Sequence, residues 1–161
     1  MLTKILNNRS IVLYLLPFCL GLLTVFSFEP FNLSFINFFL LPIFFLLLVY
    51  VGKKSKSVYR KKPYRINLFL IGFVFGFGFY LSGIFWIAYS LTFDESFKFL
   101  IPFAVILVPL FLALFCGLTT LVIGQFTSYN FSSLLLFSGS FALSDYIRGK
   151  ILTGFPWNLW A

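Results

Sequence analysis

Histidine is absent from the 161 residues of this chain, and aspartate and glutamate together number only four. The missing histidine excludes, within this chain, catalytic triads that use histidine as the base and metal sites with histidine ligands. The two cysteines, Cys19 and Cys116, lie far apart in apolar runs without a CxxC spacing, so we expect two small, buried side chains. The sequence therefore predicts no metal site and no cofactor.

Charged residues of any kind are also scarce. They make up 10% of the chain, whereas hydrophobic residues make up 61% and the mean hydropathy is +1.04. Ordinary soluble domains are about half apolar and about a quarter charged, so the composition predicts a membrane protein. The net charge of +8 comes mostly from residues 53–65, and one such basic cluster indicates membrane orientation rather than a nucleic-acid partner.

Apolar runs long enough to cross a bilayer, about 20 residues each, recur along the chain. They lie at 10–28, 31–51, 66–92, 99–124 and 131–147. We therefore predict an all-α membrane protein, a single transmembrane domain over 1–161 built as a bundle of about five transmembrane helices. Glu29-Pro30 is expected to form a tight hairpin between the first two helices, because proline ends one helix and suits the first turn of the next. No A-x-A cleavage site follows the first run, which favours a retained anchor over a signal peptide.

The basic stretch "GKKSKSVYRKKPYR" predicts the topology of the bundle. It holds seven basic residues and no acid, and it is short, so the positive-inside rule places it in the cytoplasm. By alternation the N-terminus is also cytoplasmic, while Asp94-Glu95 and the closing segment 148–161 lie on the outer side. The chain is thus predicted to be a multi-pass protein with a periplasmic closing loop.

The third apolar run carries an ordered set of glycines. On a helix, Gly72, Gly76, Gly83 and Trp86 fall on one side, since successive residues are turned by about 100°. One interpretation is a face that packs closely against another helix, with Trp86 at the membrane interface. The other is a groove for a lipid chain.

The end of the fifth run combines acidic and basic side chains. Asp145 and Arg148 are i,i+3 neighbours and are predicted to form an ion pair. Both could be snorkelling anchors at the interface. Alternatively, Arg148 and Lys150 are held on the outer side to contact phospholipid headgroups.

The closing turn "TGFPWNLW" places aromatic side chains around a proline. Gly154 lets the chain leave the helix, and Pro156 holds Phe155 extended. An aromatic-belt loop explains Trp157 and Trp160 without any function. Contact with a lipid-bearing substrate is the functional alternative.

Three stretches, taken in order, resemble the N-terminal membrane region of apolipoprotein N-acyltransferases. They are "FSFEPFNLSF", similar to the family's first hairpin, "IGFVFGFGFYLSGIFWIAYSL", similar to its third span, and "RGKILTGFPWN". The last stretch is the most specific, because it resembles the family's Arg-Gly-x-x-x-Thr-Gly-Phe-Pro-Trp segment. The resemblance extends from about residue 10 to the end of the chain.

The resemblance implies a bacterial inner-membrane enzyme whose chemistry faces the periplasm. Such an enzyme takes an acyl chain from a phospholipid onto a cysteine thiolate. It then passes the chain to the α-amino group of the lipidated N-terminal cysteine of a diacylated lipoprotein. The family's catalytic Glu, Lys and Cys belong to a nitrilase-like αββα domain that follows further spans. We expect that domain to be absent from this chain, which would then be an inactive fragment with no catalytic residue.

The partners implied are a phospholipid acyl donor, a diacylated lipoprotein acceptor and the membrane, and the oligomeric state stays open. The family's Gly-Phe-Pro-Trp segment lies near the mouth of the active site. The residues expected to bind substrate are Trp157, Phe155, Pro156, Arg148 and Trp86.

A small membrane scaffold or transporter subunit without catalysis is the alternative function. Five spans with few charges would suit such a protein. Ion-coupled carriers, however, usually place an acid or a base near the middle of a span, and no span here has one.

Overall fold

The structure is a computed structural model that describes residues 8–29, 31–55, 64–84, 92–93 and 95–151. All regular secondary structure in these ranges is helical. The first helix has three sections, a π-helical turn η1 (Ile11–Leu15), α2 (Leu16–Thr24) and a 3-10 turn η2 (Val25–Ser27). The others are α3 (Asn37–Ser55) after the 3-10 turn η3 (Ser34–Ile36), α4 (Tyr64–Gly83), α6 (Ile101–Ile123) after the 3-10 turn η4 (Glu95–Leu100), and α7 (Phe131–Ile151).

Each of the five helices overlaps one of the five predicted apolar regions, which confirms an all-α membrane bundle. By length and composition, three of them are suited to cross a bilayer: Ser34–Lys54, Tyr64–Gly83 and Lys98–Ile123. The first helix, Ile11–Ser27, is apolar but shorter. The fifth helix, α7, is less apolar because serines, Asp145 and two basic residues interrupt its sequence.

The connection between the first two helices is longer than the predicted hairpin. The first helix ends at Ser27, and α3 begins at Asn37 after the 3-10 turn. Between them the chain turns through Asn32, which has a φ of 51°. This left-handed conformation is one that asparagine tolerates better than most residues. Backbone hydrogen bonds from Leu33 to Phe26, among others, close the turn.

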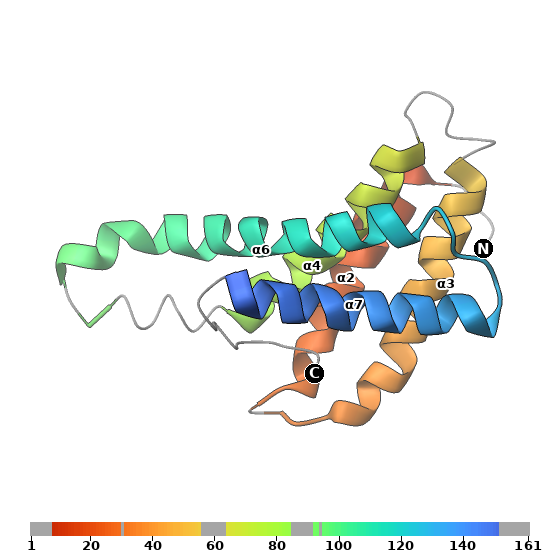
Figure 1. Cartoon of the computed structure of the whole chain (residues 1–161). Coiled ribbons are helices and arrows are strands. Elements are labelled where there is room, and N and C mark those ends of the chain that lie inside the picture. Colours follow the sequence, from red (N-terminus) through yellow and green to blue (C-terminus); the bar gives the residue numbers. More distant parts are fainter. Residues whose placement is uncertain (1–7, 30, 56–63, 85–91, 94, 152–161) are drawn as a thin grey trace.

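Helix α4 is the centre of the bundle, because it packs most extensively on α6 and next on α2 (Figure 1). A Cβ on Gly72 would overlap the Thr120 side chain, and one on Gly76 would lie 2.8 Å from Cys116 Cβ. Gly72 and Gly76 are therefore covered by α6. At these two positions the packing interpretation is confirmed, and α6 leaves no groove for a lipid chain.

A second glycine contact joins α4 to α2 on another side. A Cβ on Gly78 would lie 2.5 Å from the Phe18 carbonyl oxygen, and one on Gly21 would overlap the backbone of Phe75. The backbones of the two helices are thus in direct contact at these glycines. Such close approach is how membrane helices gain van der Waals contact where no hydrophobic effect drives them together.

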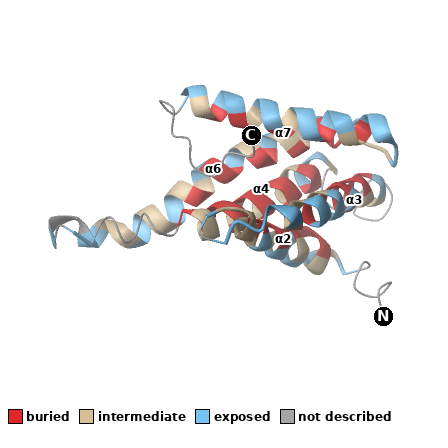
Figure 2. Cartoon of the chain, turned by 90° about the horizontal axis from the view of Figure 1, so that it is seen from below, coloured by how far each residue is buried: buried red, intermediate tan, exposed pale blue. Residues whose placement is uncertain are grey.

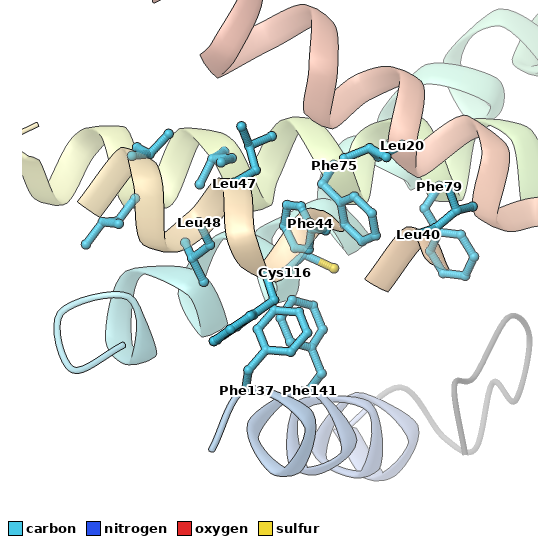
Figure 3. Packing of buried hydrophobic residues seen from close by; sticks show 14 of the residues in the cluster. Leu20, Leu40, Phe44, Leu47, Leu48, Phe75, Phe79, Cys116, Phe137 and Phe141 are labelled. Carbon is cyan, nitrogen blue, oxygen red and sulfur yellow. The ribbon is translucent and has the colours of Figure 1, made fainter. Parts of the chain in front are cut away.

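Aromatic side chains fill the space between α3, α4 and α7. Phe44 stacks on Phe75 with ring centroids 3.9 Å apart, and Phe137 and Phe141 from α7 reach the same cluster (Figure 3). These rings attach one face of α7 to the bundle. Its other face stays exposed (Figure 2).

The two cysteines differ in burial, which corrects half of the prediction. Cys116 is 4% exposed, as expected, but Cys19 is exposed, and both are free thiols. The buried stripe of α2 comprises Pro17, Leu20, Gly21 and Thr24. Cys19 lies off this helical stripe and therefore faces away from α4.

Candidate functional site at the end of α7

The last turns of α7 hold a buried ion pair. Arg148 Nη2 lies 3.4 Å from Asp145 Oδ1, and the side chains are 0% and 7% exposed. The predicted i,i+3 pair is confirmed. The alternative in which both residues are snorkelling anchors is wrong, because neither side chain extends to the protein surface.

The same guanidinium contacts the central helix. Arg148 Cζ lies 5.2 Å from the centre of the Tyr80 ring, within the range of a cation–π interaction. Tyr80 is 1% exposed, so this contact lies inside the bundle. The buried ion pair of α7 thus contacts the central helix α4.

These contacts of Arg148 fix the position and the rotation of the C-terminal end of α7. A buried charge is costly unless another charge and hydrogen-bonding groups compensate it. For Arg148 this compensation comes from Asp145, which lies on α7 itself, and from the Tyr80 ring, which lies on α4. Turning or sliding α7 would separate Arg148 from Tyr80. The helix end at Ile151, directly before the segment 152–161, is therefore held in place.

A cavity lies beside the middle of α7, before the turn that holds Asp145. It has a volume of about 350 Å³ and lies between α3 and α7. Its lining residues are Asn37, Phe38, Leu41, Phe137, Ser138, Phe141 and Ala142. Five of these seven are apolar, and the exception on α3, Asn37, has a buried Oδ1 for which the described residues supply no hydrogen-bond donor. The lining of the cavity is thus largely apolar.

Of the residues predicted to bind substrate, the structure places only Arg148. Phe155, Pro156, Trp157 and Trp86 lie outside the described residues. Within the described ranges the structure brings Arg148 together with Asp145, as predicted.

One member of the site, Tyr80, was missed by sequence analysis, which did not single it out. A tyrosine in an apolar span is a signal that could have found Tyr80, because its ring can accept a cation from a neighbouring helix. Which helix supplies the partner is a matter of tertiary packing, which spacing does not reveal.

The fold and the site together define a helical membrane protein whose fifth helix is anchored by a buried ion pair. The sequence pattern described as Apolipoprotein N-acyltransferase N-terminal domain matches residues 20–161. The chain belongs to this family, and the resemblance found in the sequence is confirmed.

Individual relatives support the same assignment. The chain is 30% identical to the apolipoprotein N-acyltransferase of Rhizobium rhizogenes over 93% of its own length and 27% of the relative's. It is 32% identical to that of Rhodopseudomonas palustris over 86% of its length and 25% of the relative's. With that of Brucella melitensis it shares 40% identity over 90 residues, 55% of this chain and 17% of the relative. The chain thus spans about a quarter or less of the length of these relatives.

Proposed function

We propose that this chain supplies the membrane part of an apolipoprotein N-acyltransferase. The enzyme would move an acyl chain from a phospholipid to the N-terminal cysteine amine of a diacylated lipoprotein, on the periplasmic side of the bacterial inner membrane. The observation that carries the proposal is the family match itself. It runs to residue 161 and so includes the segment from Arg148 through Gly-Phe-Pro-Trp.

The geometry of α7 supports a role in presenting substrate. The ion pair and the Tyr80 contact fix the helix end, and the Gly-Phe-Pro-Trp segment follows within a few residues. The cavity between α3 and α7 is largely apolar and suits an acyl chain. In this proposal the chain binds and orients lipid, whereas the thiolate chemistry belongs to the catalytic domain found in the family.

A chimera tests the proposal directly. This chain replaces the corresponding quarter of the Rhizobium rhizogenes relative, and purified protein receives phospholipid and a diacylated lipopeptide. We expect triacylated product from the chimera and none from residues 1–161 alone. The unmodified relative is the positive control. A well-folded chimera that yields no product would contradict the proposal and favour a scaffold.

Trp157 is expected to matter more than Trp160 in that chimera. Its ring offers apolar area for acyl chains, and its indole N–H can donate to an ester or headgroup oxygen. Trp157→Ala should lower the rate of acyl transfer about ten- to hundred-fold, while Trp160→Ala should leave it nearly unchanged. If the turn is only an aromatic-belt anchor, both variants should have the same activity per molecule of inserted protein.

A further inference from the structure

A second cavity lies at the other end of the bundle from Arg148. It has a volume of about 420 Å³, within the range of small-ligand pockets, and is formed between α2 and α3. Its lining residues are Leu16, Leu20, Ile43, Leu46, Leu47, Tyr50 and Tyr129. Apart from the two tyrosines, every lining side chain is aliphatic. We call this cavity the α2–α3 groove.

The α2–α3 groove is open toward the surroundings of the protein. Ile43 and Leu46 are 49% and 50% exposed, whereas Leu20 and Leu47 on its inner wall are buried. In a membrane, the medium that contacts these half-exposed side chains is the hydrocarbon of the bilayer. An acyl chain can therefore enter from the side without crossing a polar barrier.

Two lysines stand at the polar end of the groove. Lys53 Nζ lies 4.1 Å from the centre of the Tyr129 ring, and Lys54 Nζ donates a hydrogen bond of 2.5 Å to the Tyr50 hydroxyl. Both tyrosines line the groove, so each ammonium group is held beside its mouth. No acidic residue is among the lining side chains.

This end of the bundle is the one that the basic loop predicts to be cytoplasmic. The last turn of α3 carries Lys53 and Lys54, and Tyr129 belongs to the turn between α6 and α7 (Figure 1). The lysines are therefore placed at the headgroup level of the cytoplasmic leaflet. Basic pockets between membrane helices on this side commonly bind anionic lipid headgroups.

We propose that the α2–α3 groove binds an anionic diacyl phospholipid of the cytoplasmic leaflet. One acyl chain lies along Leu16, Ile43 and Leu46, and the headgroup phosphate pairs with Lys53 and Lys54. A zwitterionic lipid fits the groove equally well but brings its own cation to the lysines. Charge complementarity therefore selects the anionic headgroup. This site is distinct from the cavity between α3 and α7 and does not depend on acyl transfer.

The test measures lipid selectivity of the whole chain in phosphatidylcholine bilayers. Spin-labelled phosphatidylglycerol and spin-labelled phosphatidylcholine are added in turn, and electron paramagnetic resonance gives the motionally restricted fraction of each. We expect phosphatidylglycerol to be preferred. The double variant Lys53→Gln/Lys54→Gln should weaken this preference by about fivefold for each lysine. The double variant Arg65→Gln/Lys98→Gln has the same net charge, involves two exposed residues outside the groove, and should keep the preference.

A second pair of variants tests the groove independently of charge. Ile43→Trp fills it, whereas Phe39→Trp adds a similar ring on an exposed position of α3 outside it. We expect only Ile43→Trp to reduce the restricted fraction of phosphatidylglycerol. The proposal is overturned if both labelled lipids are restricted equally, if the two charge variants lose selectivity to the same extent, or if both tryptophan variants behave alike.

Discussion

At the scale of single residues, Arg148 is the least expected feature of the molecule. A guanidinium in an apolar helix normally extends toward water, since its long stem allows the charge to reach the interface. Here it is fully buried and instead contacts Asp145 and the Tyr80 ring. Because both charges of the pair are removed from water together, the loss of one partner leaves the other charge without compensation.

Removing one partner of this pair should therefore cost more than removing both. Arg148→Gln is expected to lower the free energy of unfolding by about 3–5 kcal/mol, and Asp145→Asn/Arg148→Gln by clearly less. Titration of the purified chain with SDS in mixed micelles, followed by circular dichroism, measures these differences.

The exposed pair Lys98–Glu95 is the matched control. It has the same i,i+3 spacing and a shorter distance of 2.8 Å, but its side chains are 50% and 92% exposed. Lys98→Gln should change the free energy of unfolding by no more than about 1 kcal/mol, because solvent screens the charges. If Asp145→Asn/Arg148→Gln lowered the free energy of unfolding by the sum of the two single losses, the idea of a compensated buried pair would be contradicted.

Residue patterns predicted the ion pair but not its surroundings. The spacing of Asp145 and Arg148 is local, and any helix through this segment brings the two side chains together. Tyr80 is 68 positions away from Arg148 in the sequence, and its contact depends on how α7 crosses α4. The burial of Arg148 could not be predicted for the same reason.

At the scale of helices, α4 explains why the bundle forms. Its glycines lie on two sides, with Gly72 and Gly76 toward α6 and Gly78 toward α2. On the α6 side, Thr120 Oγ1 donates a 2.8 Å hydrogen bond to the Leu68 carbonyl, so a polar contact adds to the close packing. Small residues and interhelical hydrogen bonds are the main sources of helix association in lipid.

A methyl group on Gly72 should separate α4 from α6. It would overlap Thr120 and lie 2.5 Å from the Cys116 carbonyl oxygen, which is backbone and cannot turn away. Gly72→Ala is expected to destabilise the bundle by about 1–3 kcal/mol. Thermal unfolding in detergent, followed by size-exclusion chromatography, should show a lower midpoint.

Gly139→Ala on α7 is the control for this change. Nothing lies within 4 Å of a Cβ at Gly139, so the substitution only improves helix propensity. Its midpoint should be equal to that of the original chain or slightly higher. If Gly139→Ala lowered the unfolding midpoint as much as Gly72→Ala, the loss in Gly72→Ala would not be caused by helix–helix contact at Gly72.

The sequence predicted the existence of the helices better than their ends and neighbours. The apolar runs located all five helices, because a bilayer requires runs of this length. Pro30 led to a prediction that α3 would begin at 31, whereas a turn through Asn32 delays the helix to Asn37. Glycine spacing indicated a packing face on α4, but the choice of α6 as partner depends on side chains such as Thr120 and Cys116 in a distant segment.

At the scale of the whole molecule, the two ends of the bundle have different chemistry. One end combines Lys53, Lys54 and the hydrogen bond from Arg9 Nη2 to Asn67 Oδ1. The other end carries Glu95 and the last residue of α7, Ile151. The first half of α6 extends past the other described helices (Figure 1), and much of its surface, including Phe103 and Leu107, is exposed.

The polarity of the ends predicts the orientation of the bundle in the membrane. Asn130 and Glu95 are exposed residues beyond opposite ends of α6, so the membrane should separate them. Single cysteines at these positions, in a Cys19→Ser/Cys116→Ala background, report which side each one faces. In intact cells a membrane-impermeant maleimide should label Glu95→Cys and should label Asn130→Cys only after permeabilisation, since the positive-inside rule places the basic end in the cytoplasm. A permeant maleimide should label both variants and shows that each cysteine is reactive. Labelling of Asn130→Cys from outside would invert the bundle and place the Gly-Phe-Pro-Trp segment in the cytoplasm, where it could not serve a periplasmic acyl transfer.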